Sequence, residues 1–334
     1  NRYVPVRNSF KVFRHHPSIP HSLNHNNVSS IAGDSNGFIW IGTRGGGLDR
    51  LDPETGIFKH YMSGNAPQAI QETPYINGLL VDEGDDLWIA TYDRGLIHFD
   101  PSESSHTHYR SIPEDNTTLS GDYLLRIFQD TRKQIWIGTW GAGLSLYQSD
   151  KNQFYRFLHD PSDPHSLCDN MVHVIHETTN DTGRIIWVGT SGGLSYFDPD
   201  TGPDFKFNHI NQSDGLPSNV IYGILEDGSG HLWISTNNGL CRYHHETRSF
   251  NNYDVHDGLQ SNEFNAGACI KLENKQLLFG GVNGFNSFHP DRITTSRYAP
   301  PIVLTSFQIF NEPVAFNQAL NTVQRIDLAF SEHF

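Results

Sequence analysis

Ile39-Trp40-Ile41-Gly42-Thr43 is the stretch that decides the fold, because it returns along the chain at a nearly fixed spacing. Each copy has an apolar residue, a tryptophan, another apolar residue, a small residue and a threonine, and a Gly-Leu pair usually follows. The later copies are Leu87–Thr91, Ile135–Thr139, Ile186–Thr190 and Leu232–Thr236, with Leu277–Gly281 a degenerate sixth. Their centres lie 45 to 51 residues apart. A period of this length, built of strands, is typical of propeller blades.

Each repeat predicts four strands. An inner strand such as Val28–Ile31 comes first, and the turn Asp34–Gly37 leads from it into the tryptophan strand. A third strand follows the Gly-Leu pair, and a fourth carries aromatic residues three apart, as at Phe58 and Tyr61. The tryptophan strands are apolar on both faces, which is expected of sheets packed between other sheets. The sequence therefore predicts an all-β propeller of four-stranded blades with its tryptophans buried between them.

Composition and charge exclude several classes of protein. The 334 residues are 36% hydrophobic and include 30 glycines, which suits many short strands joined by tight turns. The formal net charge is −14 without any cluster of Lys or Arg, so nucleic acid is not an expected partner. No apolar stretch approaches the roughly 20 residues that span a bilayer. This part of the protein is therefore not expected to contact the membrane.

Neither the cysteines nor the histidines predict a metal or cofactor. The three cysteines form no CxxC pair, so neither a disulfide framework nor a zinc site is indicated. Among the 19 histidines, the adjacent pairs His15-His16 and His244-His245 would point to opposite faces of a strand and cannot share one ion. The sequence analysis therefore expects no cofactor and no metal site.

The two ends of the sequence depart from the repeat. Asn1–Pro5 matches Asp49–Pro53, so residues 1–14 are predicted to be the outer strands of an interrupted blade. Residues 15–295 carry the propeller repeats, and residues 296–334 are expected to hold a linker and the start of another domain. Six repeats and a half-blade favour a seven-bladed ring in the intact protein. A ring of six blades closed by the amino-terminal strand is the alternative.

The repeat resembles a known family. Its pattern is Asn-x-Val-x-x-Ile-x-x-Asp-x-x-Gly-x-Ile-Trp-Ile-Gly-Thr-x-x-Gly-Leu, and Pro-Ser-x-Pro-His-Ser-Leu occurs at Pro17–Leu23 and Pro161–Leu167. Both features are similar to the two-component regulator propeller family. The closing stretches Pro300–Val314 and Ile326–Phe330 resemble the start of the tyrosine-rich immunoglobulin-like domain that follows such propellers.

The resemblance implies a sensor and not an enzyme. It implies the periplasmic part of an inner-membrane receptor, whose signal-transduction output is a histidine kinase of the two-component (hybrid) type or a GGDEF cyclase. A homodimer of the intact receptor is a further implication.

The loops that follow the threonines form the candidate ligand site. Two connections of each blade reach the same face near the central channel, and their residues vary from blade to blade while the strands repeat. The residues after the threonines are Arg44, Tyr92, Asp93, Arg94, Trp140 and Asn237, and Asn283 follows Gly281 of the sixth repeat. The opposing loops add Tyr75 and Tyr123. Cationic, aromatic and amide side chains at one mouth predict a polar ligand with stacking faces, such as an oligosaccharide. The alternative is that these surface loops simply face water.

Two other functions stay open at this point. The first is an enzyme, such as a glycan or cyclic-peptide lyase, with Asp93 and either Asp122 or Glu263 as acid and base. The second is a scaffold that binds another protein through the propeller face. Turnover of a bound ligand would distinguish the enzyme from the sensor, and a flat mouth would favour the scaffold.

Overall fold

The structure is a computed structural model, and it describes residues 12–61, 75–180, 183–202, 205–293, 308–309 and 312–313. The chain divides into two units, residues 1–292 and 293–334. In the second unit, β24 (Gln308–Ile309) and β25 (Glu312–Pro313) pair antiparallel. Most of the predicted half-blade at residues 1–14, and nearly all of the predicted immunoglobulin-like segment, lie outside the described residues.

The first unit is a propeller of six blades, each an antiparallel sheet whose strands follow chain order. Five blades have four strands, and the sixth has three among the described residues. Blade 1 holds β1 (Val28–Gly33), β2 (Ile39–Thr43), β3 (Leu48–Leu51) and β4 (Phe58–His60), and blade 2 holds β5 (Ile76–Val81), β6 (Leu87–Thr91), β7 (Leu96–Asp100) and β8 (Ser105–Tyr109). Blade 3 holds β9 (Leu124–Gln129), β10 (Ile135–Thr139), β11 (Leu144–Gln148) and β12 (Gln153–Phe157), and blade 4 holds β13 (Val172–Asn180), β14 (Gly183–Thr190), β15 (Leu194–Phe197) and β16 (Asn208–Ile210). Blade 5 holds β17 (Ile221–Glu226), β18 (Leu232–Thr236), β19 (Gly239–His244) and β20 (Ser249–Tyr253), and blade 6 holds β21 (Phe264–Lys271), β22 (Leu277–Gly281) and β23 (Gly284–Phe288).

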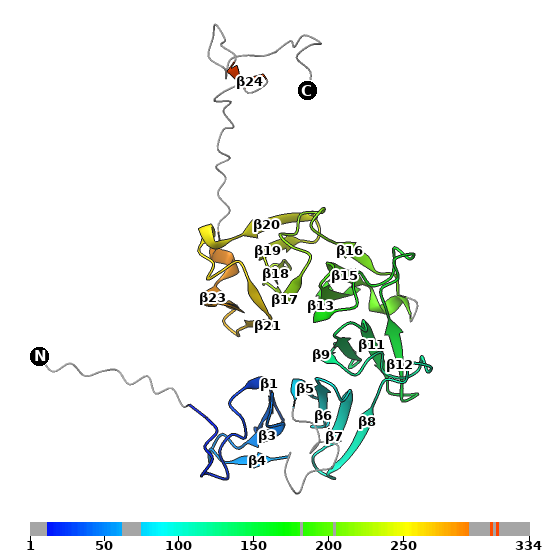
Figure 1. Ribbon diagram of the computed structural model, residues 1–334, viewed down its shortest axis with the longest axis vertical. Coiled ribbons are helices and arrows are strands. Elements are labelled where there is room, and N and C mark those ends of the chain that lie inside the picture. The colour runs from blue at the N-terminus through cyan, green and yellow to red at the C-terminus, as the bar shows by residue number, and fades with distance from the viewer. Residues whose placement is uncertain are drawn as a thin grey trace, which may run out of the picture. The chain divides into compact units, whose positions relative to one another are not determined.

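The blades of this unit are arranged around a central channel, with the first strand of each blade nearest the centre (Figure 1). Inner strands of successive blades pack against one another in the order β1, β5, β9, β13, β17 and β21. The predicted all-β propeller of four-stranded blades is confirmed in the form of six blades. A seventh blade is not seen among the described residues.

The repeated tryptophans form the core between adjacent sheets, as predicted. Trp40, Trp88, Trp136, Trp187 and Trp233 are each at most 4% exposed. Trp40 packs against Tyr61 of its own blade and Phe99 of the next, with ring centroids 5.0 and 6.4 Å away. Trp136 contacts Phe197 of the following blade at 5.4 Å. Each blade therefore buries its apolar face only by contact with its neighbour.

The aspartate turns do more than reverse the chain. In blade 1, Asp34 accepts backbone N–H groups of its own turn at Asn36 and Phe38 through Oδ1. Its Oδ2 accepts the Trp40 indole N–H at 2.9 Å. The same indole bond recurs in three other blades, at Asp82, Asp130 and Asp227. The sequence analysis predicted the turn but missed that the aspartate satisfies a buried donor.

Helices in the described part of the chain are limited to the short 3₁₀ turns η1 (Pro199–Thr201), η2 (Val255–Asp257) and η3 (Pro290–Arg292). None of them is long and apolar enough to cross a membrane. The cysteines Cys168, Cys241 and Cys269 are free thiols.

Candidate functional site

Buried threonines hold the loops at one face of the propeller. Thr43, at the end of β2, donates its hydroxyl to the carbonyl of Gly47 and accepts the amide of Gly46. The same pair of bonds recurs in the next four blades, at Thr91, Thr139, Thr190 and Thr236. The residue that follows each threonine therefore starts a loop of fixed geometry.

A β-bulge near the start of each of the first five inner strands shapes the channel beside these loops. The pairing register with the tryptophan strand shifts there, which leaves one residue of the inner strand unpaired. A bulge re-aims the side chain that it carries. The bulged residues are Ser29, Asn77, Leu125, His173 and Tyr222, and all five line one cavity at the centre of the ring.

That central cavity has a volume of about 620 Å³ and takes lining residues from all six blades. Arg44, Trp140 and Glu263 reach it from the loops, and Arg126 reaches it from β9. A second cavity of about 420 Å³ lies beside it and is lined by Arg44, Tyr75, Asn77, Tyr92 and Asp93. Arg44 and Asn77 line both cavities, so the two form one continuous site, which we call the mouth.

The structure brings six of the nine predicted residues together at the mouth. Arg44, Tyr75, Tyr92, Asp93 and Trp140 line its cavities. Tyr123 lies edge-on to Tyr92 with ring centroids 5.5 Å apart, and Tyr75 lies 6.3 Å from Tyr92 on its other side. These three tyrosines and Trp140 are each about half exposed, between 48% and 56%. They form an aromatic rim with open faces.

The other three predicted residues do not line either cavity. Asn283 is held by Gln260, which accepts its backbone amide at 2.7 Å and its side-chain amide at 3.1 Å. Arg94 donates its backbone amide to Thr91, and Asn237 lies in the loop after β18. These three residues lie in the loops where they were predicted, but they do not line the two cavities of the mouth.

Arg126 gives the centre of the mouth a positive charge. Its Nε donates to the carbonyl of His173 at 2.7 Å. A Cβ atom on Gly267 would collide with its guanidinium, so the side chain reaches β21 of the sixth blade. Burial lowers the pKa of Arg126, but a guanidinium stays protonated in proteins. With Arg44 also present, and Glu263 the one carboxylate lining the central cavity as described, cations outnumber anions there.

Two polar groups of the mouth lack partners within the described part of the chain. Asn77 is 5% exposed and donates Nδ2 to the carbonyl of Leu124, but its Oδ1 accepts no hydrogen bond. The Arg44 guanidinium makes no hydrogen bond or ion pair with the residues described. A buried acceptor without a partner costs about 1–3 kcal/mol, so a ligand donor that reaches Asn77 would recover that energy.

Sequence reasoning missed Asn77, Arg126 and His173. All three lie in inner strands, where alternation alone does not tell which side chains enter the channel. A signal was present, because the second residue of the inner strand differs among the first five blades while the residue before it is always apolar. Only the bulge explains why that variable position faces the mouth.

His173 is expected to make folding stability depend on pH. Burial, with a smaller contribution from Arg126, lowers its pKa to about 4, and burial lowers the pKa of His176 to about 4 as well. Below about pH 6.5, the unfolded chain therefore binds protons at these two histidines that the folded chain does not bind. The unfolding free energy falls as the pH drops from about 6.5 to about 4. The slope per histidine is at most about 1.4 kcal/mol per pH unit.

Urea unfolding at several pH values between 7 and 5 checks this prediction. The variant His173→Gln keeps an amide near Ser191, which His173 contacts through Nε2 at 2.9 Å, and cannot titrate. The unfolding free energy of this variant should fall less steeply with falling pH than that of the wild type, by the contribution of one histidine. A variant with the full wild-type pH dependence would contradict the assignment.

The carboxylates proposed for an enzyme are not arranged as a pair. Asp93 lines the side cavity and Glu263 lines the central one. Asp122 forms an ion pair with Arg110 at 2.8 Å and accepts the Ser111 amide. An acid and a base must reach the same substrate atom group, and no cavity described at the mouth is lined by two of these three carboxylates.

Fold and site together define a β-propeller with a polar, aromatic-rimmed mouth on its channel. Two of its segments, residues 22–45 and 215–238, match the family of two component regulator propellers. Both matched segments are repeats of the propeller, so the match agrees with the family resemblance of the sequence.

The chain is similar to other proteins in sequence or in structure. Over 123 residues the chain is 39% identical to histidine kinase P4 of Formosa agariphila, a match that covers 36% of this chain and 9% of that protein. The extracellular domain of the putative hybrid two component system BT3049 from B. thetaiotaomicron is similar at a TM-score of 0.52 and 24% identity, covering 89% of this chain and 45% of that one. Virginiamycin B lyase of Staphylococcus aureus has a TM-score of 0.54 at 13% identity, over 80% and 85% of the two chains. At these identities the structural matches show the fold, and the chain spans less than half of the first two relatives.

Proposed function

We propose that this chain is the extracytoplasmic, ligand-sensing part of a membrane-bound hybrid two-component receptor, and that the mouth binds an oligosaccharide or another polar small molecule. The family supports a signalling role, and the curated relative is named a histidine kinase, which favours a kinase output over a GGDEF cyclase. The observation that carries the ligand is the unpartnered Asn77 Oδ1 between two cavities, framed by exposed aromatic rings.

The chemistry of the mouth favours an acidic oligosaccharide. Flat faces of Tyr75, Tyr92 and Trp140 suit the apolar face of a sugar ring, and cavities of about 620 and 420 Å³ lie in the range of small-molecule sites. Arg44 and Arg126 would pair with a carboxylate or sulfate group. Such charge-assisted bonds are about twice as strong as neutral ones.

Signalling requires that the ligand prefers one conformation of the receptor. A ligand moves a conformational equilibrium only as far as its affinities for the two states differ. The central cavity takes residues from all six blades, so a ligand there would contact elements that belong to different sheets. Binding would therefore be sensitive to how the blades are placed around the channel.

A thermal-shift screen of the propeller against neutral and acidic oligosaccharides of equal length tests this proposal. A ligand that binds only the folded state raises its stability by RT ln(1 + [L]/Kd), about 2.7 kcal/mol at 100 times Kd. We expect the acidic compounds to raise the melting temperature more than the neutral ones. Equal, small shifts for both sets would contradict an acidic ligand. Appearance of cleaved product during the incubation would instead support the enzyme alternative.

We further propose that a seventh blade, to which residues 1–14 contribute, completes the ring between blades 1 and 6. The two blades stand on either side of an opening in Figure 1. Both blades also carry exposed large apolar side chains. Ile31 of β1 and Phe285 of β23 are each 65% exposed, and Ile270 of β21 is 55% exposed. The leucines that match Phe285 in the other blades, such as Leu96 and Leu240, are at most 1% exposed.

Thiol labelling of the variant Ile270→Cys checks this part of the proposal. The new thiol should react readily in the present chain and be protected in the full-length receptor. Val282→Cys, in a mouth loop, is the matched control and should react in both. Equal reactivity at position 270 in both proteins would exclude a covering blade.

A further inference from the structure

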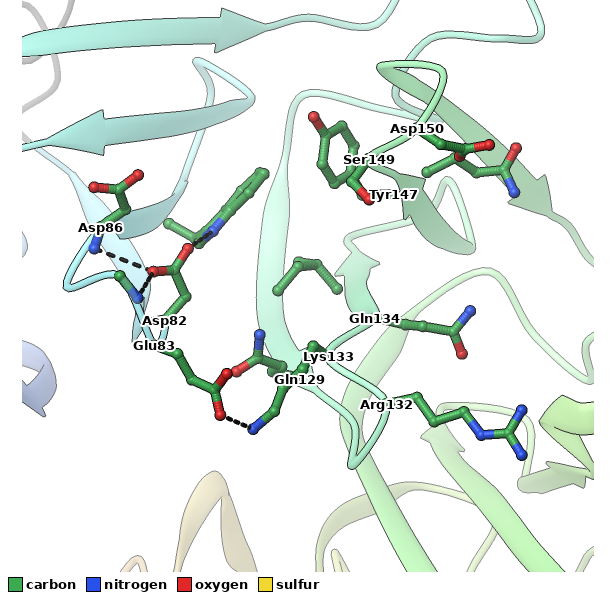
Figure 2. Close-up of a pocket in the computed structure, with 14 residues that line it drawn as sticks. Asp82, Glu83, Asp86, Gln129, Arg132, Lys133, Gln134, Tyr147, Ser149 and Asp150 are labelled. Carbon is green, nitrogen blue, oxygen red and sulfur yellow. Dashed lines mark hydrogen bonds and ion pairs between the residues drawn. The ribbon is translucent and has the colours of Figure 1, made fainter.

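The face opposite the mouth carries a cavity of about 540 Å³ between blades 2 and 3 (Figure 2). The turn that joins β5 to β6 forms one wall, and it places four carboxylates in five residues, from Asp82 to Asp86. Lys133 of blade 3 forms an ion pair with Glu83 across the cavity at 2.6 Å. The other carboxylates of the turn take no part in this ion pair.

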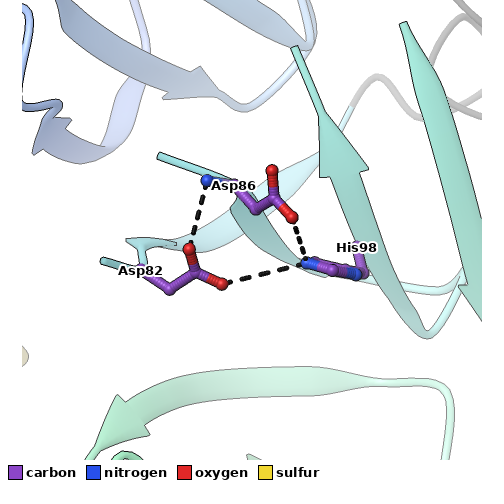
Figure 3. Close-up of side chains that lie close together, drawn as sticks. All are labelled: Asp82, Asp86 and His98. Atoms are coloured by element: carbon purple, nitrogen blue, oxygen red, sulfur yellow. Dashed lines mark hydrogen bonds and ion pairs between the residues drawn. The ribbon is translucent and has the colours of Figure 1, made fainter. Parts of the chain in front are cut away.

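Asp82, Asp86 and His98 converge at this turn (Figure 3). His98 Nε2 lies 3.2 Å from Asp86 Oδ2 and 3.9 Å from Asp82 Oδ2, and the three ligand atoms all lie within 4.8 Å of one another. Oxygen and nitrogen ligands sit about 2.0–2.2 Å from a zinc ion, which places two of them about 3.0–3.6 Å apart. Small side-chain movements would therefore bring all three atoms to bonding distance of one ion.

The surroundings hold these side chains in place. Asp82 Oδ1 accepts the amides of Gly84 and Asp86, at 2.9 and 3.2 Å, and its Oδ2 accepts the Trp88 indole N–H at 3.0 Å. The His98 ring stacks on Trp88 with centroids 4.1 Å apart. His98 Nε2 is shielded from water, and its contact with Asp86 Oδ2 at 3.2 Å lacks the geometry of a hydrogen bond. An imidazole nitrogen that faces two carboxylates in this way can share a cation with them.

Asp82 belongs to the repeat, since aspartates of three other blades accept the same indole bond, whereas Asp86 and His98 are particular to blade 2. The residue paired with the tryptophan, which is His98 in blade 2, is Arg50, Leu146, Tyr196 or Arg242 elsewhere. In blade 5, the guanidinium of Arg242 lies 3.3 Å from Asp227 Oδ2. Blade 2 has the His98 imidazole in place of that arginine, and it also has Asp86. Blade 2 therefore has three potential metal ligands where blade 5 has a guanidinium ion pair.

We propose that Asp82, Asp86 and His98 bind a divalent transition-metal ion such as Zn²⁺ or Mn²⁺. Mixed carboxylate and imidazole ligands suit these ions. Three protein ligands leave coordination positions that water or an anionic group can fill, and Asp82 and Asp86 both line the cavity. The site is independent of the mouth, because it lies at the other end of the strands and uses none of the mouth residues.

Calorimetric titration of the propeller with ZnCl₂, without any oligosaccharide, tests the proposal. Asp86→Asn should weaken zinc binding at least about tenfold, since even loss of an outer-shell partner typically costs 10–100-fold. Asp85→Asn is the matched control, because it removes the same charge from the same turn. The Asp85 carboxylate contacts Ser35 of blade 1 instead, so this variant should bind zinc nearly as the wild type does. Equal weakening by both variants would reduce the effect to general attraction by the acidic turn and would overturn the site.

A paramagnetic ion locates the site directly. MnCl₂ added to fluorotryptophan-labelled protein should broaden the fluorine NMR signal of Trp88 before that of Trp140, which lies in the mouth. His98→Gln should abolish this selective broadening while the signals of the five tryptophans other than Trp88 keep their folded positions. Broadening of Trp88 that survives in His98→Gln, or zinc affinity unchanged in both ligand variants, would contradict the proposal.

Discussion

Replacing Trp136 with alanine is expected to lower the unfolding free energy by about 3–5 kcal/mol, the usual cost of removing a large aromatic side chain from a core. Trp136 is fully buried and packs against Phe157, Phe197 and Phe205 at 5.4–6.2 Å. Its loss would leave a void between blades 3 and 4 and would remove the indole N–H that Asp130 accepts at 3.1 Å. Urea unfolding followed by circular dichroism measures the effect.

Two further substitutions make this test specific. Trp140 lies four residues away and is 56% exposed, so Trp140→Ala should change the unfolding free energy by no more than about 0.5 kcal/mol. Trp136→Phe keeps one aromatic ring but loses some buried volume and the indole hydrogen bond, so its cost should fall between those of Trp136→Ala and Trp140→Ala. Equal costs for Trp136→Ala and Trp140→Ala would contradict a core that lies between the blades.

Replacing Arg44 with alanine is expected to weaken binding of an acidic oligosaccharide about 10–100-fold. A hydrogen bond to a charged group contributes about 1.5–3 kcal/mol, and each 1.4 kcal/mol is a factor of ten in affinity. Arg44 borders both cavities of the mouth, and the described residues offer its guanidinium no partner. Folding stability should therefore stay nearly unchanged, which separates binding from folding.

Arg110→Ala is the matched control for this prediction. Arg110 is also partly exposed, but its guanidinium is already paired with Asp122 at 2.8 Å. Its removal should leave ligand affinity within about twofold, because an exposed ion pair contributes at most about 1 kcal/mol and lies outside the mouth cavities. If both arginine variants lost affinity equally, general electrostatic attraction and not a formed site would account for binding.

The sequence predicted the blades well because their physical cause repeats. A buried tryptophan between sheets needs an apolar strand, a turn before it and a close Gly-Leu pair after it, and each of these is visible in single residues. The loop residues Arg44, Tyr92 and Trp140 were also predictable, since they differ from blade to blade next to a threonine that does not change.

The rest of the mouth depends on geometry that single residues do not reveal. Asn77 and His173 enter the channel because a bulge shifts the register of their strands, and nothing in their local sequence distinguishes a bulge from regular pairing. Arg126 reaches the sixth blade from the third, a contact between residues 141 positions apart along the chain when counted to Gly267. Such convergence follows only from the closed arrangement of the blades.

The fluorine NMR spectrum of the fluorotryptophan-labelled propeller, recorded with and without an acidic oligosaccharide, tests ligand binding at the mouth most directly. The chain has six tryptophans, of which Trp140 alone is exposed at the mouth, while the other five are buried between blades. The account predicts that the ligand shifts the one signal that Trp140→Phe removes and leaves the five core signals in place. A ligand that shifts core signals while the Trp140 signal stays unchanged would contradict binding at the mouth.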